Sequence, residues 1–445
     1  MTDDLLSLAQ DAVDMARKAG ASAAEAVAVS RLGTDIEWRE GVIEKLEQAE
    51  AREIGLRVFA GQSSAIISGS VLTRAAVQRL AEQALAMARL APPDPFAGVA
   101  AEADLAKQFP DLDLISPELP SSERLLTMAR EVEEAALAVQ GVAKSGGSSA
   151  SASRRDMALA ISNGFARGYG RTGVSLSASA IAGEGTAMQR DYDYSYATHF
   201  GDLRSAAEVG REAGLRTVKR MSPRKLKSQP VTAIYDRRIA SGLVGHLLGA
   251  INGASVARGT SFLKDALGTE VFAPGITIVE DPFLKRGPGS RPFDGEGLSG
   301  AKRNLIDKGQ LTGWLLDLRS ARQLGLTPQG QASRGLASPP SPTVSNVYLE
   351  AGTETPTALM TQIGTGLLVT ELMGTSINMV TGDYSRGASG FWFENGEIVY
   401  PVSEVTIAGN LKTMYRNLTP ANDLEFRSST NAPSLVVEGM TLAGL

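Results

Sequence analysis

Two long stretches of β-type alternation, each uninterrupted by helix, are the feature that most limits the folds open to this chain. Between Glu25 and Ser70, apolar and polar residues alternate as in half-buried strands, and Gly33, Gly41 and Gly61 are predicted to separate successive strands. A second stretch, over residues 142–200, reads as four more strands. Strands that follow one another directly pair as antiparallel hairpins, whereas parallel strands need a long crossover. The sequence therefore predicts an α+β fold in which a mainly antiparallel sheet carries its helices on one face.

Amphipathic segments bracket these stretches and suggest how the chain divides. Helical spacing of apolar residues occurs at 5–16, 74–89, 122–139 and 202–221. We predict an N-terminal α+β domain over residues 1–225, made of two α-β-α halves joined by a Pro-rich linker at about 92–121, and a second domain over 226–445.

The second domain is predicted to be a β-rich sandwich or barrel. Its strands are short and rich in glycine, and only Arg237–Ile251 has a convincing helical pattern. Asn395-Gly396 lies between two strand-like segments, and this pair predicts a type I′ hairpin. The basic, Pro-flanked segment 222–230 is predicted to be the domain boundary.

Composition narrows the function classes. The chain has 445 residues, a net charge of −5, two histidines (His199 and His246) and no cysteine. The acidic balance argues against nucleic-acid binding, no stretch approaches the roughly 20 apolar residues of a membrane span, and the lack of cysteine favours the cytoplasm. With two distant histidines, neither a zinc site of ordinary composition nor a Ser-His-Asp triad is expected from local motifs.

Two local patterns have both a functional and a structural interpretation. Gly295–Gly300 reads GEGLSG, but it follows RPFD rather than an apolar strand, so a glycine-rich loop is favoured over a dinucleotide site. Asp191 and Asp193 share one face of a strand whose other face carries Tyr192, Tyr194 and Tyr196. This strand could contact a peptide or a metal, but a half-buried strand with an aromatic face is favoured, with His199 as a structural residue.

Across nearly its whole length the chain resembles the TldD/PmbA family of metallopeptidase-related proteins. The resemblance is carried by FDGEGLSGAKRNLIDKGQLTGWLLDLRSARQLGLTPQG (293–330) and SGFWFENGEIVYPVSEVTIAGNL (389–411), and GDYSRGASGFWFENGEIVYPV (382–402) is more similar to the PmbA (TldE) branch. The resemblance implies a two-domain subunit that dimerises, with zinc bound in a TldD subunit by H-E-x-x-x-H and a later cysteine. In that motif two histidines face one ion and the glutamate acts as general base on its bound water.

In this chain the matching stretch is SGLVGH. Ser241 occupies the position of the first histidine, Gly242 that of the glutamate, and His246 matches the second histidine. A single imidazole does not hold Zn²⁺ tightly, so we expect neither catalytic nor metal-binding residues in this chain, and zinc in a TldD-type partner.

The resulting prediction is a non-catalytic, cytoplasmic subunit of a TldD–TldE-type complex acting on unfolded or extended peptides. Its partner would be a TldD-type subunit, or a second copy when isolated. A glycine-containing segment is the candidate peptide-facing region: Thr381, Gly382, Asp383, Tyr384, Ser385 and Arg386.

Two alternatives remain open. One is a self-sufficient hydrolase using serine or paired carboxylates such as Asp191/Asp193 or Glu394/Glu397. The other is a regulatory binding protein without a proteolytic role, which the family's past association with DNA gyrase suggests.

Overall fold

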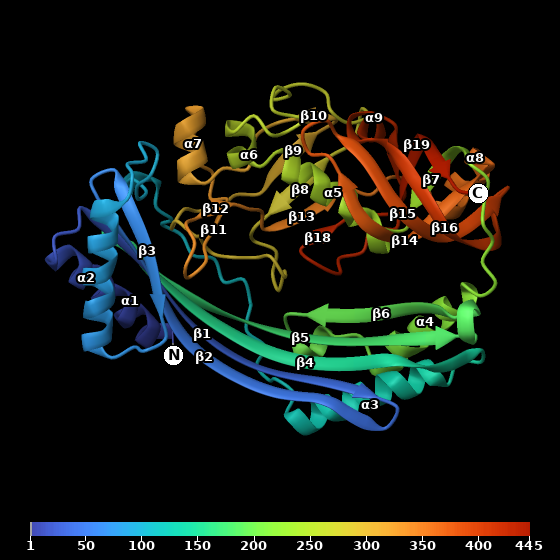
Figure 1. Ribbon diagram of the computed structural model, residues 1–445, viewed down its shortest axis with the longest axis horizontal. Coiled ribbons are helices and arrows are strands. Elements are labelled where there is room, and N and C mark those ends of the chain that lie inside the picture. The colour runs from blue at the N-terminus through green and yellow to red at the C-terminus, as the bar shows by residue number, and fades with distance from the viewer. Residues whose placement is uncertain (1) are drawn as a thin grey trace.

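The computed structural model describes residues 2–445, and its N-terminal half is built on one six-stranded sheet (Figure 1). The spatial order is β3-β2-β1-β4-β5-β6, and every neighbouring pair is antiparallel. The strands are β1 (Ala23–Arg39), β2 (Val42–Ala60), β3 (Ser63–Gly69), β4 (Val142–Ile161), β5 (Ala166–Ala182) and β6 (Gln189–Ala197). The predicted α+β class with an antiparallel sheet is confirmed.

The strands are longer and fewer than predicted. Gly33 lies inside β1, paired with Ala49 on one side and Ser153 on the other, so it does not separate two strands. Similarly, the two runs predicted at the start of the second stretch form the single strand β4. An extended residue held by ladders on both sides needs no turn, whereas Gly41 and Gly61, with φ of 86° and 63°, do turn the chain.

Four helices cover one face of this sheet, as predicted. They are α1 (Thr2–Lys18), α2 (Arg74–Leu90), α3 (Ser122–Leu137) and α4 (Ala206–Lys219). The apolar sides of α1 and α2 pack on Ala26 and Ala28 of β1, while α3 and α4 pack around Ile36 farther along the same strand. Because alternate residues of a strand share a face, both helix pairs lie on the same side of β1 (Figure 1).

The opposite face of the sheet meets the C-terminal half. Val27 and Val29 of β1 share a small apolar cluster with Phe293. The Pro-rich segment 92–121 runs between the halves with only a short 3-10 turn, η1 (Glu102–Asp104). It is anchored to the C-terminal half by backbone hydrogen bonds at Ala106 and Leu112.

The C-terminal half contains a closed five-stranded barrel. Its strands run in the order β16-β15-β14-β7-β19, and a further pairing of β16 with β19 closes the ring. Only the β14–β7 pair is parallel. The strands are β7 (Gln229–Tyr235), β14 (Thr365–Ile377), β15 (Asp383–Glu394), β16 (Glu397–Asn410) and β19 (Leu435–Ala443), with β17 (Leu418–Pro420) beside β19. The predicted β-rich, barrel-like character is confirmed.

Asn395 and Gly396 connect β15 to β16 as predicted. Both have positive φ, 51° and 88°, which is the backbone conformation of a type I′ turn.

A second, smaller sheet adjoins the barrel, and helix α5 (Arg237–Ala250) packs into the core between them. This sheet holds β8 (Ile278–Asp281), β9 (Arg303–Asp307), β10 (Gln310–Leu311), β13 (Asn346–Leu349) and β18 (Thr430–Asn431), with the separate pair β11 (Ala332–Ser333) and β12 (Ser341–Pro342) nearby.

The prediction that 237–251 is the only helix of this half was wrong. Four further helices are present: α6 (Gly253–Ala257), α7 (Leu318–Leu324), α8 (Pro356–Ile363) and α9 (Leu411–Arg416). Each is eight residues or shorter, too short for an apolar period to emerge from the sequence. The sequence does contain capping residues at their starts, for example Thr355 followed by a proline at the start of α8. Within residues 2–445, each helix is too short or too polar to cross a bilayer.

Candidate functional site

Helix α5 carries the residues that the sequence placed at the altered metal motif. The helix starts directly after β7, where the Asp236 carboxylate accepts the Arg238 N–H and caps the first turn. Leu243, Val244 and Leu247 turn into the core, which leaves the opposite side of the helix outward. The motif positions therefore lie on the outward side because the apolar residues lock the helix rotation.

The three motif positions differ in exposure. Ser241 and His246 are half-buried, and Gly242 is exposed. A Cβ placed on Gly242 would have no atom within 4 Å, so this position is open space rather than a close backbone contact. Ser241 lines a small cleft that also contains Tyr192, Tyr194 and Arg427.

The imidazole of His246 packs against an aromatic ring and lies in the field of a cation. Its ring centroid lies 6.0 Å from that of Tyr384 with the planes at 67°, an edge-to-face arrangement. Burial, and then the positive charge of Arg386, lower the pKa of His246 below its ordinary value. His246 is therefore neutral at pH 7.

The residues at this helix do not fit a zinc ion. Catalytic zinc needs about three protein ligands, usually His, Asp, Glu or Cys. Here Gly242 has no side chain, Ser241 offers only a neutral hydroxyl, and the Arg386 charge near His246 opposes a cation. Among the described residues, His, Asp and Glu side chains nowhere form a group of three suited to a metal.

The candidate peptide-facing segment lies beside this imidazole, a juxtaposition that the sequence did not predict. Thr381 Oγ1 donates to an Asp383 carboxylate oxygen at 2.6 Å, and Asn410 Nδ2 donates to the other at 3.0 Å. These hydrogen bonds hold the pKa of Asp383 below its usual value. Gly382 has a φ of 87°, which explains why glycine stands at this turn.

From Asp383 onward the segment belongs to β15, a barrel strand with a paired neighbour on each side. Tyr384 and Ser385 are paired with β14 on one side and with β16 on the other. The backbone at these residues therefore has no free edge for another strand. Tyr384 itself is buried, whereas Ser385 and Arg386 are half-buried.

Asp191 and Asp193 lie on one face of β6, as predicted, but both are ion-paired to arginines. Asp193 accepts from Arg204 at 2.7 Å and from Arg216 and Arg427 at 2.8 Å each. Asp191 accepts from Arg220 at 3.3 Å and Arg238 at 2.9 Å. We call these seven residues the aspartate–arginine cluster.

The aspartate–arginine cluster connects the two halves of the molecule. Arg427 and Arg238 come from the C-terminal half, while both aspartates come from β6. Burial alone would raise the pKa of Asp193, but hydrogen bonds and charge from its three arginines outweigh burial and lower it. The tyrosine face of β6 also binds an arginine of the C-terminal half, since the Arg238 guanidinium lies 5.2 Å from the ring centre of Tyr192. No local sequence pattern indicated the aspartate–arginine cluster, because its arginines are spread over more than 200 positions.

The other polar patterns also have structural roles. His199 Nε2 lies 2.8 Å from the carbonyl oxygen of Asp113, and His199 is buried, as a structural histidine should be. In the glycine-rich loop, Asp294 accepts the N–H groups of Glu296 and Leu298 at 2.8 and 2.9 Å. Burial raises the pKa of both Asp294 and Glu296. The loop is thus organised around its own carboxylates.

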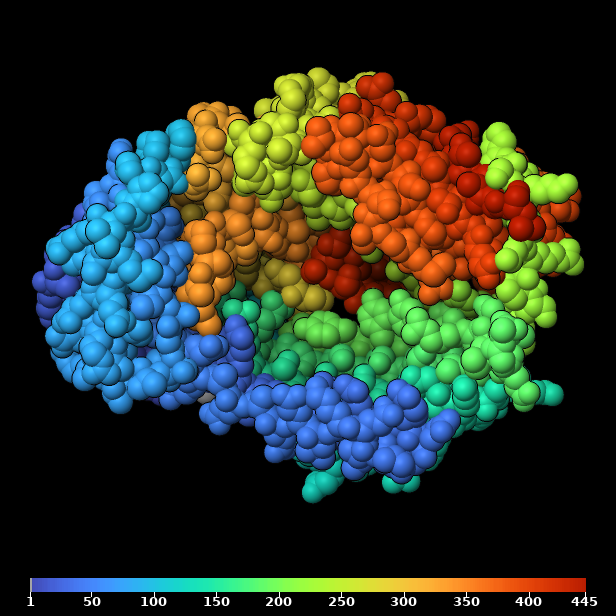
Figure 2. Space-filling model, viewed as in Figure 1, coloured from blue at the N-terminus to red at the C-terminus, as the bar shows by residue number. Residues whose placement is uncertain are grey.

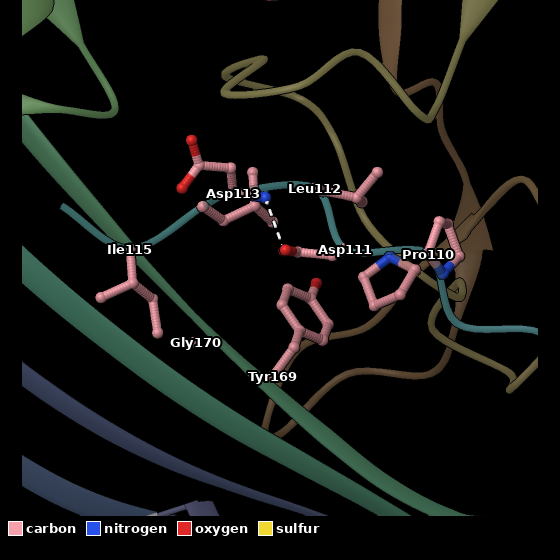
Figure 3. Close-up of a pocket in the computed structure, with 9 residues that line it drawn as sticks. Pro110, Asp111, Leu112, Asp113, Ile115, Tyr169 and Gly170 are labelled. Atoms are coloured by element: carbon pink, nitrogen blue, oxygen red, sulfur yellow. Dashed lines mark hydrogen bonds between the residues drawn. The ribbon is translucent and has the colours of Figure 1, made fainter. Parts of the chain in front are cut away.

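A cavity of about 370 Å³ lies beside the Pro-rich segment (Figure 3). It is lined by Pro110, Asp111 and Leu112 on one side and by Tyr169 of β5 on the other. Asp111 is engaged with the backbone, since it accepts the Asp113 N–H at 3.0 Å. None of the residues predicted for the site lines this cavity.

Comparison with known proteins agrees with this architecture. Three family models match consecutive parts of the chain: domain 1 of the PmbA/TldA metallopeptidases at residues 24–88, their central domain at 115–221 and their C-terminal domain at 228–444. The metalloprotease PmbA of Escherichia coli O157:H7 is 40% identical over 96% of this chain and 93% of its own length. The chain belongs to the PmbA/TldD family.

Solved structures of PmbA/TldD-like proteins share the whole fold. A crystal structure from Bacteroides thetaiotaomicron superposes with a TM-score of 0.91 at 30% identity, covering 99% of this chain and 98% of the other. TldE from Thermococcus kodakarensis superposes with a TM-score of 0.87 over 98% of this chain and all of its own. At 20% identity, the latter match shows a common fold. The two halves and the closed barrel therefore belong to the architecture of the PmbA/TldD family.

Proposed function

We propose that this chain is the non-catalytic subunit of a TldD–TldE-type zinc metallopeptidase complex that acts on unfolded or extended peptides. The observation that carries the proposal is the composition of the outward face of α5. Ser241 and Gly242 stand where the family motif needs a ligand and a general base, and the remaining His246 is neutral and packed on Tyr384. The TldD-type partner would supply the zinc and the general base.

The surroundings of His246 support a role without metal. A zinc-binding imidazole is usually oriented by a carboxylate or carbonyl on its second nitrogen. His246 instead faces the Tyr384 ring and lies in the field of Arg386. This arrangement gives the helix a fixed, uncharged outer face, suited to lining a chamber whose chemistry occurs on another subunit.

The segment Thr381–Arg386 is proposed to contact the peptide through side chains. Because β15 is paired on both sides, a substrate cannot join it as an added strand at Tyr384 and Ser385. The exposed Thr381 and Asp383 and the half-buried Arg386 remain available to a polar peptide backbone.

The aspartate–arginine cluster weighs against a self-sufficient hydrolase built on Asp191 and Asp193. A general acid or base must be able to exchange its proton with substrate near the working pH. Asp193 is buried, its pKa is lowered, and three arginines occupy its oxygens. We propose that the pair serves to hold the domains together, in a protein that works in the cytoplasm.

A reconstitution assay tests this proposal. The purified chain, a purified TldD-type protein and their mixture are each given an unfolded, fluorescently labelled peptide, with and without a zinc chelator. We expect cleavage above background in the mixture alone, and loss of that cleavage with the chelator. Zinc-dependent cleavage by this chain alone, or a mixture no more active than the TldD-type protein, would overturn it.

A further inference from the structure

A second cavity lies between α4 and the wall of the barrel, and it shares Arg237 and Arg238 with the small cleft at Ser241. It has a volume of about 620 Å³, within the range of ligand-binding pockets. It lies along the junction of the two halves, where Figure 2 shows the surface hollowed between the barrel strands and the strands of the N-terminal sheet. We call it the α4–barrel cleft.

One wall of the α4–barrel cleft is apolar. It is formed by side chains of β14, β15 and β16: Leu368, Phe391, Ile398, Val399 and Tyr400. Ile398 and Val399 are 51% and 50% exposed, although both are large aliphatic residues. Adjacent apolar groups left in water at the mouth of a cavity mark a surface that gains free energy when an apolar ligand covers it.

The opposite wall is charged, and each of its carboxylates already accepts an ion pair or a hydrogen bond. Asp191 is paired with Arg220 and Arg238, Glu212 with Arg216, Asp423 accepts from Ser434, and Asp236 caps α5. The arginines that line the cleft are paired as well: Arg216 with Asp193 and Glu212, Arg237 with Glu425, and Arg238 with Asp191.

Lys219 is the exception. It is the last residue of α4, it is exposed, and within residues 2–445 it makes no ion pair or side-chain hydrogen bond. Among the cations that line the cleft, Lys219 is therefore the one without a carboxylate partner, and it lies on the wall opposite the apolar one. The two lining carboxylates without a cation, Asp236 and Asp423, already accept hydrogen bonds from neutral donors. A ligand that matches both features has a carboxylate next to a bulky apolar group.

We propose that the α4–barrel cleft binds a peptide segment in which a carboxylate adjoins a large apolar side chain, with the carboxylate at Lys219 and the side chain against Ile398 and Val399. The choice of a peptide rests on the proposed function. The cleft would give the complex a preference among peptides, since the main chain is common to all of them but this pair of groups is not.

Calorimetric titration of the full chain with three short peptides tests this inference. The probes are acetyl-Ala-Leu-Phe with a free carboxylate, the same peptide as its amide, and acetyl-Glu-Leu-Phe amide. The free acid should bind about fivefold more tightly than its amide, the effect of one solvent-accessible ion pair near the upper end of its range. Binding of acetyl-Glu-Leu-Phe amide at the strength of the acid would show that a side-chain carboxylate also serves, whereas binding at the strength of the simple amide would restrict the site to a chain terminus.

Two variants locate the site. Lys219→Gln should remove the difference between acid and amide, and Val399→Ser should weaken both peptides. Lys227→Gln is the matched control, because Lys227 is also exposed but does not line the cleft. Unchanged affinities in Lys219→Gln, equal binding of acid and amide to the native chain, or no binding of any probe would overturn the inference.

These measurements need neither zinc nor a partner. If the mixture of subunits cleaves peptides while Lys219→Gln leaves binding unchanged, only the cleft inference fails. If the cleft binds as expected while the mixture does not cleave, the proposed function fails on its own.

Discussion

Replacing Asp193 by asparagine should destabilise the chain more than any other single removal of charge in the aspartate–arginine cluster. The Asp193 side chain is 1% exposed, and it is the common acceptor for Arg204, Arg216 and Arg427. The amide is nearly the same size but leaves three guanidinium groups facing one another. Removing one partner from a buried ion pair costs about 3–5 kcal/mol, because the remaining charge stays desolvated.

The surroundings of Asp193 predict that the cost of Asp193→Asn lies near the lower end of this range. Arg204 and Arg216 are 35% and 19% exposed and can regain water, and Arg216 keeps Glu212 at 2.9 Å. Arg427, at 13% exposed, keeps Glu425 at 3.9 Å as its remaining carboxylate and the Tyr194 carbonyl oxygen at 2.7 Å. We therefore expect a loss of about 3 kcal/mol. With a urea slope of about 3 kcal/mol per molar, the unfolding midpoint falls by roughly 1 M.

Urea unfolding followed by tryptophan fluorescence measures this loss in both halves, since Trp38 lies in the N-terminal sheet and Trp314 and Trp392 lie in the C-terminal half. Glu212→Gln is the matched control, because it removes a more exposed partner of Arg216 and should cost less than about 1 kcal/mol. A loss below about 0.5 kcal/mol in Asp193→Asn, or an equal loss in Glu212→Gln, would refute the reasoning.

The pH dependence gives an independent check on the same residue. The pKa of Asp193 is lowered by folding, so its stabilisation is fully present above the unfolded value of about 3.9 and is lost as pH falls through the lower folded value. The difference in stability between the native chain and Asp193→Asn should therefore be constant near neutral pH and shrink in acid. A difference that grows as the pH falls below 4 would contradict the assigned charge state.

Three further predictions concern α5 and the barrel. The pKa of the His246 imidazole should lie below its ordinary value of about 6.5 and rise in Arg386→Gln, which NMR can follow because the chain has only two histidines. Since folding lowers this pKa, His246 reduces the stability of the fold below about pH 6.5. An unchanged titration midpoint in the variant would exclude a role for the Arg386 charge. The double variant Ser241→His with Gly242→Glu should fold, because both positions face outward, yet purify without stoichiometric zinc; metal analysis showing one tightly bound zinc per chain would contradict the ligand argument. Gly390→Ala should destabilise the barrel by about 2 kcal/mol or more in thermal unfolding, because its methyl would collide with a carbonyl of β14, whereas Gly242→Ala on the exposed helix face should stabilise by about 0.5–1 kcal/mol; equal effects would refute the packing argument.

The fold class was predictable because it follows from local periodicity. Alternation over 25–70 and 142–200 required consecutive strands, and consecutive strands pair antiparallel. The mistake at Gly33 has a physical cause: glycine permits a turn but does not force one when strands on both sides hold its backbone. The short helices of the C-terminal half escaped prediction because a helix of five to eight residues has no measurable period.

The candidate site was predictable only in part. The residues at 241, 242 and 246 could be found by resemblance, and the cap at Asp236 fixes where their helix begins. The contact of His246 with Tyr384 depends on how α5 and β15 are placed in the fold, which no local pattern encodes. The same limit applies to Asp193, whose partners lie 11, 23 and 234 positions away along the chain.

Closure of the barrel has a consequence for how the chain reaches its folded state during synthesis. β7 pairs with β14 and β19, and about 200 residues separate the end of β7 from the start of β19. At ribosomal speeds of about 5–20 residues per second, β7 waits at least roughly ten seconds for its last neighbour. During that interval its apolar residues and an unpaired edge are open to other nascent chains, so the aggregation hazard of this protein falls late in translation, and a chaperone that shields residues 229–235 should raise the yield of folded protein.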